Sequence, residues 1–419
     1  MTETLTGPAV DPGDVTADAS GGRDAPDDAR DRATRRRRNA VRWCAVLTVV
    51  ALGGLGWMGL QGYDAATKIK GGAQATIVTD PSAAGFVAAV TPSPVHLLAL
   101  TDADDSLSAL FLLVPATTGG GGSVVWSLGE LIIEVDGEKT SLASLYGGEG
   151  DAAARLATVR SEYERVLGFG VTDITVVGPT ELAALIEPVG ALTFKNPDRV
   201  SVEENGKRVE QYKAGAITLE PGEISEYLTV RGAGEAPENR AIRASIVMDA
   251  IFVGYQELAA PPQATVVTDI GVSIAEVLGA IAAGSHEFFV LPTERQAYET
   301  SFLYSPDPAG IAESLGDVVQ FPVSSFPGQR PRVRILNGTA DATRAKAVAP
   351  QVARAGGEVL LIGNNPTFDV AATSVVYSNS SFEAVAQRTA DIFGVTAVRS
   401  EALSDAADID VVLGADYTG

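Results

Sequence analysis

The chain holds few histidines and cysteines, two residue types that often carry out catalysis or bind metals. Its 419 residues include two histidines, His96 and His286, and a single cysteine, Cys44. A histidine-based site would need both histidines, so two ordinary residues embedded in the fold are the favoured interpretation. A single cysteine excludes a disulfide within the chain and a thiolate metal cluster. Because Cys44 lies in the most apolar stretch of the chain, a membrane-buried residue is favoured over a lipidated one.

Two groups of closely spaced acidic residues are candidates for binding or catalysis. Asp102, Asp104 and Asp105 could hold a cation, although an exposed turn is the favoured interpretation. Glu130 and Glu134 are four residues apart in strand-like sequence and are expected to share a face, but this spacing does not define a glycosidase pair. The chain has no Gly-x-Ser-x-Gly, Ser-x-x-Lys or His-Glu-x-x-His motif, which disfavours the hydrolase classes that use them.

The net charge narrows the range of partners. The formal charge is −22 at pH 7, and 46% of the residues are hydrophobic. Nucleic-acid binding needs clustered Lys and Arg, so a chain of this charge is expected to repel nucleic acid. The hydrophobic content is sufficient for buried cores, and the length allows more than one domain.

The N-terminal part has the features of a membrane anchor. Residues 1–38 lack apolar periodicity and are predicted to be a disordered cytoplasmic tail. Residues 39–62 are predicted to be a transmembrane helix, because residues 43–60 carry no charge and follow a run of arginines. The positive-inside rule then places the C-terminal bulk outside the cytoplasm. A cleaved signal peptide is disfavoured, since the lead-in is long and no clear Ala-x-Ala site follows. Residues 63–90 are predicted to be a stalk.

Beyond the stalk, two kinds of hydrophobic period alternate, which predicts an α/β fold. Strands are predicted from short apolar runs with β-branched residues, at 95–100, 110–114, 124–128, 131–135, 174–177 and 286–291. Helices are predicted from apolar residues at three- and four-residue spacing, at 151–167, 180–186, 239–253 and 274–283. The glycine-rich residues 117–123 lack a following Gly-Lys-Ser/Thr and are interpreted as a hairpin loop rather than a phosphate-binding loop.

Three prolines between residues 321 and 331 mark a boundary, after which a smaller unit begins. Strands are predicted there at 332–336, 359–363, 374–377, 398–400 and 409–413, with helices at 341–355 and 382–393. With residues 398–400 and 409–413 taken together as the closing strands, this is a β-α-β-β-α-β unit of a size that can fold alone.

The last unit, residues 330–419, resembles the LytR C-terminal domain of actinobacterial envelope proteins. The resemblance rests on residues 333–339 (Val-Arg-Ile-Leu-Asn-Gly-Thr), 373–377 (Thr-Ser-Val-Val-Tyr) and 411–417 (Val-Val-Leu-Gly-Ala-Asp-Tyr). The β-α-β-β-α-β order also occurs in small modules that bind peptidoglycan glycans, which is an analogy of fold alone.

Residues 91–325 resemble a diverged LytR-CpsA-Psr core. Residues 97–102 (Leu-Leu-Ala-Leu-Thr-Asp) look like the first strand of the family, and residues 145–148 (Leu-Tyr-Gly-Gly) look like a segment that ends in paired glycines. Residues 188–191 (Pro-Val-Gly-Ala) stand where the family has Gly-Gly-Val. The segment from 227 to 243, with its arginines, looks like the stretch that leads into the pocket helix.

The resemblance implies a chemistry and also shows where this chain departs from it. Active members transfer a polyprenyl-pyrophosphate-linked glycopolymer to a cell-wall acceptor, a reaction that needs arginines and a divalent ion, Mg²⁺, around the pyrophosphate. The family's Arg-x-Ser-Asp-Thr is replaced here by residues 105–110 (Asp-Ser-Leu-Ser-Ala-Leu), and its Ser-Ile-Pro-Arg-Asp by residues 127–131 (Ser-Leu-Gly-Glu-Leu). The resemblance leaves Arg231, Arg240 and Arg243 as pyrophosphate ligands and Asp102 as a metal ligand.

Two hypotheses follow. The first is a non-catalytic, LytR-CpsA-Psr-like pseudoenzyme of the cell membrane that binds a cell-wall polymer, a lipid-linked glycan or an envelope protein. The second is an active glycopolymer phosphotransferase with rearranged ligands and Mg²⁺. Arginines that converge in a deep apolar pocket would favour the second, and arginines used only in the fold would favour the first. The historical label of the family, transcriptional regulator, is disfavoured because the predicted topology leaves no room for a cytoplasmic DNA-binding domain.

Overall fold

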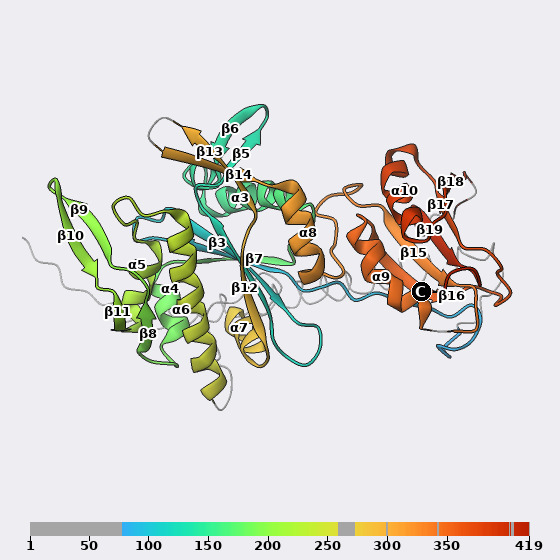
Figure 1. Ribbon diagram of the computed structural model, residues 1–419, viewed down its shortest axis with the longest axis horizontal. Helices are drawn as coiled ribbons and strands as arrows, with labels where there is room; N and C mark the ends of the chain where they lie inside the picture. The colour runs from blue at the N-terminus through green and yellow to red at the C-terminus, as the bar shows by residue number, and fades with distance from the viewer. Residues whose placement is uncertain are drawn as a thin grey trace, which may run out of the picture. The chain divides into compact units, whose positions relative to one another are not determined.

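The computed structural model describes residues 78–258, 273–298, 301–341, 343–401, 403 and 406–418 (Figure 1). All of them fall within one compact unit that spans residues 76–419. The predicted cytoplasmic tail, the predicted transmembrane helix at 39–62 and residues 63–77 of the predicted stalk lie outside the described residues. None of the helices described is both long enough and apolar enough to cross a membrane.

A five-stranded mixed sheet forms the centre of the first half of this unit. Its strand order is β12-β4-β3-β2-β7, with β2 parallel to β7, β4 parallel to β12, and β3 antiparallel to both of its neighbours. The strands are β2 (His96–Thr101), β3 (Leu107–Pro115), β4 (Gly122–Leu128), β7 (Asp173–Val177) and β12 (His286–Val290). Every residue of β2 is buried, as are all but the last of β3, so both faces of the sheet must be covered.

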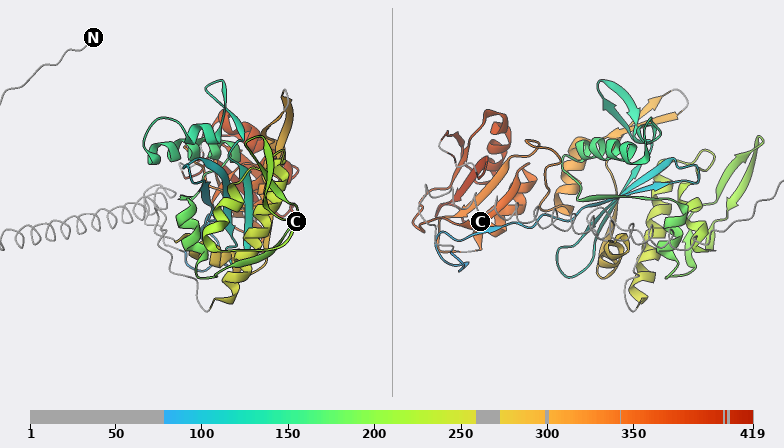
Figure 2. Two further views of the ribbon diagram at one scale, coloured as in Figure 1. Left: turned by 90° about the vertical axis from the view of Figure 1, so that its left-hand side faces the viewer. Right: turned by 180° about the vertical axis from the view of Figure 1, so that it is seen from behind.

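Helices provide that cover (Figure 1). The long helix α6 and α7 contact β3 or β4 on one side, and α2, α3 and α8 lie on the other. Figure 2 shows the same layers from behind. The helices are α2 (Leu142–Tyr146), α3 (Ala152–Leu167), α4 (Pro179–Ile186), α5 (Ile224–Thr229), α6 (Pro237–Glu257), α7 (Ile274–Ala282) and α8 (Pro308–Val318). A 3₁₀ turn, η1 (Pro221–Glu223), precedes α5.

Four two-stranded ribbons extend from this core, and the sequence did not predict three of them. Each is antiparallel. They are β5 (Ile132–Val135) with β6 (Glu138–Ser141), β8 (Leu192–Asn196) with β11 (Gly215–Leu219), β9 (Val200–Glu204) with β10 (Lys207–Tyr212), and β13 (Thr293–Tyr298) with β14 (Ser301–Pro306). The strands of β9 and β10 are largely exposed, so they lack the apolar alternation by which a strand is recognised.

The second half contains a six-stranded sheet of order β1-β16-β15-β19-β17-β18. Burial alternates along β19, as expected for a sheet covered on one face, and the two helices that contact the sheet also contact each other. The elements are β1 (Val87–Ala89), β15 (Arg332–Asn337), α9 (Arg344–Arg354), β16 (Glu358–Asn364), β17 (Ser374–Tyr377), η2 (Ser380–Phe382), α10 (Glu383–Ile392), β18 (Ala397–Arg399) and β19 (Ile409–Leu413).

The N-terminal strand β1 was not predicted. Residues 87–89 were expected to belong to the stalk, but they pair antiparallel with β16 at the edge of the six-stranded sheet. Two of the three residues are alanines, and all three are exposed, so no hydrophobic pattern announces the strand. The chain thus passes through the second sheet before it enters the first.

Two separate hydrophobic cores accompany the two sheets. One consists of residues between 95 and 319, and the other of residues between 333 and 413. Backbone and side-chain contacts link them. Ser93 N donates to Phe321 O, Gly170 forms a bridge with Val323, and Arg354 pairs with Asp317.

Candidate functional site

The predicted site residues lie at or near one edge of the five-stranded sheet. Because β2 and β4 both run antiparallel to the strand between them, their carboxyl ends reach the same edge. Asp102 follows β2 directly, and Glu130 comes two residues after β4. With one strand between β2 and β4, their carboxyl ends are about 10 Å apart by the usual spacing of strands. Carboxyl ends of parallel strands are where open α/β sheets usually bind ligands.

The start of helix α6 brings two of the predicted arginines to this edge. Pro237 occupies the first turn, where its missing N–H costs no hydrogen bond. Arg240 and Arg243 follow three residues apart and therefore share a face of the helix. Both are buried in spite of their charge, so each must have a compensating partner.

The partner of Arg240 is Glu130. Nη1 and Nη2 of Arg240 donate to the two carboxylate oxygens of Glu130 at 3.1 and 3.3 Å. Arg231, whose side chain is 58% exposed, approaches the same carboxylate with its Nη2 2.8 Å from Oε1. We call Glu130, Arg231 and Arg240 the Glu130 cluster. Glu130 lies in the turn before β5 and not in a strand, so the expectation that it shares a strand face with Glu134 was wrong.

Arg243 is committed to the fold itself. Its guanidinium donates to Tyr227 O and to Val230 O, at the end of α5, and holds both oxygens of Glu235 at 3.0 and 2.9 Å. It also lies over the ring of Tyr227, 5.3 Å from the ring centroid. Burial lowers the pKa of Arg243, and the charge of Glu235 opposes this shift. These contacts join the end of α5 to the start of α6.

The positive charges that a pyrophosphate would need are already paired with carboxylates of the same chain. Arg231 and Arg240 contribute two positive charges and Glu130 one negative charge, so the cluster carries a net charge of +1. Arg243 and Glu235 form a neutral pair. A pyrophosphate would have to displace the Glu130 carboxylate from its bidentate contact with Arg240, because both anions would use the same donors. Glu130 thus holds the donors that the resemblance assigned to the ligand.

Two cavities lie near the predicted arginines. One, of about 30 Å³, is bordered by Leu131 and Pro237, and none of the three residues of the Glu130 cluster lines it. Arg243 lines a different, larger cavity of about 290 Å³, together with Arg199 and Arg208 but without Arg231 or Arg240. Arg231 and Arg240 share the carboxylate of Glu130, whereas Arg243 binds Glu235. Neither of these two cavities is lined by all three arginines.

Asp102 serves the turn between β2 and β3. Its Oδ1 accepts hydrogen bonds from Asp104 N at 3.0 Å and from Ser106 N at 2.9 Å. Asp105 adopts a positive φ of 57° and pairs with Arg155 at 3.3 Å. In the part of the chain that the structure describes, no three His, Cys, Asp or Glu residues come together as metal ligands. Asp102 therefore stabilises the turn through Oδ1, and its role as a metal ligand stays a prediction of the resemblance.

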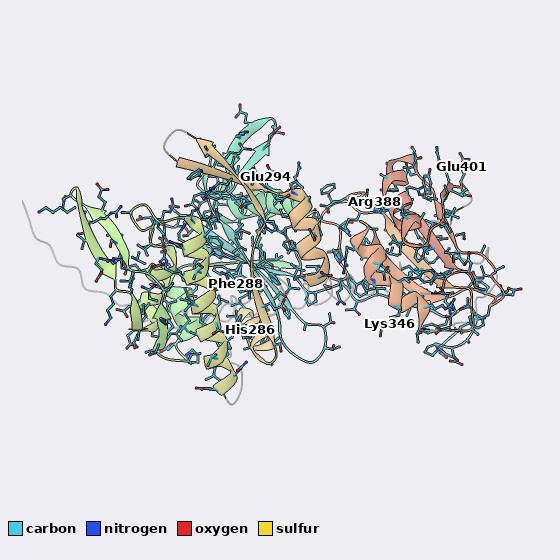
Figure 3. All side chains as sticks on the ribbon, in the orientation of Figure 1. His286, Phe288, Glu294, Lys346, Arg388 and Glu401 are labelled. Carbon is cyan, nitrogen blue, oxygen red and sulfur yellow. The ribbon has the colours of Figure 1, made fainter. Side chains whose placement is uncertain are left out.

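The other sequence-level candidates have structural roles as well. His96 is buried on β2 beside Asp173, whereas His286 Nε2 lies 3.1 Å from Asp249 Oδ1 (Figure 3). The sequence did not identify Glu235, which lies in a glycine-rich loop eight residues before Arg243. For Glu130, the sequence offered one indication of a role, its position where the resembling family has Arg-Asp. From the sequence alone this replacement indicates the loss of a phosphate ligand, and it does not reveal the new ion pair with Arg240.

Comparison with known families matches the C-terminal unit. Residues 330–417 match the family described as LytR cell envelope-related transcriptional attenuator. This match confirms the resemblance of the C-terminal residues. Comparison with curated proteins found no match.

Solved structures show distant likenesses to a larger part of the chain. A LytR-Csp2A-Psr enzyme from Actinomyces oris is 17% identical, with 57% of this chain and 93% of that chain covered and a TM-score of 0.42. B. subtilis TagV is 12% identical, with 54% and 97% covered and a TM-score of 0.41. TagT bound to LI-WTA is 15% identical, with 59% and 94% covered and a TM-score of 0.40. Likenesses this distant carry no conclusion about activity or ligand.

Proposed function

We propose that this chain is a membrane-anchored, extracytoplasmic protein of the cell envelope that binds a cell-wall polymer without transferring it. The predicted transmembrane helix at 39–62 supports the anchor and orientation, and the family match of residues 330–417 supports a role in the cell envelope. The arrangement is that of a LytR-CpsA-Psr-like scaffold, or pseudoenzyme.

The Glu130 cluster carries the non-catalytic part of this proposal. Phosphoryl transfer depends on cationic groups placed where negative charge develops. Here the fork of Arg240 is filled by a carboxylate of the same chain, and Arg243 is held by Glu235 and two carbonyls. Removing one such donor from an active site costs about 100- to 1000-fold in rate. Carboxylates that occupy these donors should likewise lower the rate of phosphoryl transfer.

The test exchanges the carboxylate of Glu130 for an amide in the full chain, purified in an uncharged detergent. A short-chain polyprenyl pyrophosphate is titrated by calorimetry with and without Mg²⁺, and transfer of a linked glycan is assayed in parallel. We expect no saturable binding and no transfer by the natural chain. Glu130→Gln should gain saturable binding of the polyprenyl pyrophosphate, because both arginines then become available.

Glu134→Gln is the matched control, because Glu134 is an exposed glutamate on β5 only four residues away. It should behave like the natural chain. Saturable binding by the natural chain that Arg240→Ala abolishes, together with Mg²⁺-dependent transfer, would instead establish the phosphotransferase hypothesis. Equal gains in Glu130→Gln and Glu134→Gln would show that overall charge, and not the cluster, governs binding.

A further inference from the structure

A second set of arginines surrounds a cavity of about 520 Å³ where the end of α3, helix α8 and the end of α9 meet. Four arginines line it, and among the residues that the structure describes they are its only charged lining residues. Arg165 lies in the last turn of α3, Arg354 ends α9, Arg388 lies on α10, and Arg330 precedes β15. Figure 3 labels Arg388. We call this cavity the arginine groove. It is cationic in a chain whose formal charge is −22.

Two of these arginines bind backbone carbonyls rather than carboxylates. Arg330 donates to Gly168 O at 3.4 Å, to Gly357 O at 3.1 Å and to Ala353 O. Arg388 Nε donates to Ala355 O at 3.0 Å. Ala353 and Ala355 lie at the C-terminal end of α9, where the backbone N–H of Gly356 already donates to Ala353 O, so Arg330 adds a further donor to that carbonyl. A helix end offers only about half a negative charge, and the charge of Glu358 also acts on Arg330, so the two positive charges are compensated only in part.

The pKa of Arg330 reflects its burial first and the neighbouring charges second. Burial lowers the pKa of Arg330 to about 10, Glu358 opposes the shift, and the positive charge of Arg388 adds to it. Arg330 remains protonated at neutral pH. Its Nε is buried without a hydrogen-bond partner among the residues described. An anion in the groove would relieve the repulsion between Arg330 and Arg388.

The other two arginines have only weak carboxylate partners. Arg354 pairs with Asp317, whose side chain is 76% exposed, and Arg165 Nε lies 3.6 Å from Glu162 Oε1. Ion pairs at the surface contribute about 0–1 kcal/mol, so a multivalent anion can compete for these guanidinium groups. Neither carboxylate lines the groove.

The size and lining of the groove favour a chain over a single ion. Four guanidinium groups come from different elements around a volume many times the roughly 30 Å³ of a water molecule. Arginine forks bind phosphate oxygens in pairs. Val166, Pro308 and Ala312, none of which is buried, supply apolar lining against which the C–H groups of a polyol or sugar can pack.

We propose that the arginine groove binds a phosphodiester-linked polyanion, such as a segment of a polyol-phosphate or sugar-phosphate chain. This inference rests on the proposed function and assigns the polymer a site distinct from the Glu130 cluster. Arg165 belongs to the part of the chain with the first hydrophobic core, and Arg354 and Arg388 to the part with the second. A bound chain would therefore contact both.

The test titrates a lipid-free glycerol-phosphate oligomer into the full chain in uncharged detergent, followed by calorimetry. The double variant Arg165→Gln/Arg354→Gln should weaken binding at least about tenfold, since two guanidinium forks are lost. These two arginines are chosen because their side chains are 64% and 48% exposed, so their loss should leave the fold intact. Circular dichroism melting verifies this. Binding by the natural chain should weaken steeply as salt is raised.

The matched control is Arg199→Gln/Arg208→Gln, which removes the same charge from two exposed arginines that line the 290 Å³ cavity. Its affinity should equal that of the natural chain. Equal weakening by both double variants would overturn the groove as the site, and so would unchanged binding by the groove variant. If inorganic phosphate bound as tightly as the oligomer, the inference that the ligand is a polymer rather than a single ion would be overturned.

The failure of this inference can be separated from the failure of the proposed function. Purified cell-wall polymer is offered to the same proteins in a sedimentation assay. If the natural chain and the groove variant both bind the polymer equally well, the groove assignment fails and the proposed function stands. If the natural chain binds neither polymer nor oligomer, both fail.

Discussion

The region of the Glu130 cluster and the arginine groove place arginines in different electrostatic settings. Around the cluster, Arg240 and Arg243 each hold both oxygens of a carboxylate. In the groove, Arg330 and Arg388 bind neutral carbonyls, and no acidic residue lines the cavity. The availability of an arginine for a ligand thus depends on the partner that the fold gives it, and the position of the arginine in the sequence does not reveal that partner.

The difference also has a consequence for stability. Removing a buried arginine that has a carboxylate partner destabilises the fold strongly, because the carboxylate is left as an unpaired buried charge. An arginine that caps a helix with carbonyl bonds leaves only neutral acceptors behind when it is removed. The two regions should therefore respond differently to the loss of a single guanidinium.

The largest effect is expected for Arg243→Ala. Arg243 is 2% exposed, and its removal leaves Glu235 without its partner and frees the carbonyls of Tyr227 and Val230. We expect a loss of about 3–5 kcal/mol in the free energy of unfolding. Urea unfolding of the full chain in detergent, followed by circular dichroism, measures it. Arg231→Ala is the control, since the exposed side chain of Arg231 should contribute less than about 1 kcal/mol. Equal losses in both variants would contradict the structural role of Arg243.

A smaller effect is expected for Arg330→Met. Methionine keeps much of the length of the side chain but loses three hydrogen bonds to carbonyls. The expected loss is about 1–3 kcal/mol, below that of Arg243→Ala, because no carboxylate hydrogen-bonded to Arg330 is left behind. The same unfolding experiment measures it, with Arg399→Met, an exposed arginine on β18, as the control. A loss as large as that of Arg243→Ala would show that Glu358 depends on Arg330 after all.

The sequence predicted the elements that a hydrophobic period marks. Strands β2 and β4 and the helices α3 and α6 lie where apolar spacing placed them, and the order of elements after Arg332 agrees with the prediction. The ribbon of β9 and β10 and the strand β1 were missed because their residues are mostly exposed. Helix α8 was missed as well, although Asp307 caps it and Pro308 begins it, which is a usual start signal.

The candidate site was less predictable than the fold. The sequence pointed to Arg240 and Arg243, and both reach the region around the carboxyl edge of the first sheet. Their partners, Glu130 and Glu235, lie 110 and 8 residues away along the chain, and nothing local reveals these pairings. The arginine groove is harder still, because its four members come from separate elements. Only the folded chain brings such charges together.

The smallest effect concerns a buried pair that joins neither set of arginines. His96 and Asp173 lie opposite each other on β2 and β7, and both are buried. Nδ1 of His96 and Oδ2 of Asp173 have no hydrogen-bond partner in the described part of the chain. Burial lowers the pKa of His96 below its usual value, and the charge of Asp173 opposes this shift only in part. The folded chain therefore holds His96 neutral where the unfolded chain would bind a proton.

The direction of the pH dependence follows from this shift. Above the unfolded pKa of about 6.5 the neutral form prevails in both states, and the contribution to stability is fully present. As the pH falls below about 6.5 and then through the lower folded pKa of His96, the unfolded state gains protons first and stability is lost. The loss is about 1.4 kcal/mol for each unit between the two pKa values. Urea unfolding at about pH 8 and about pH 5 should show a smaller difference for His96→Gln than for the natural chain. If the difference were the same in both proteins, the buried pair on β2 and β7 would not be its source.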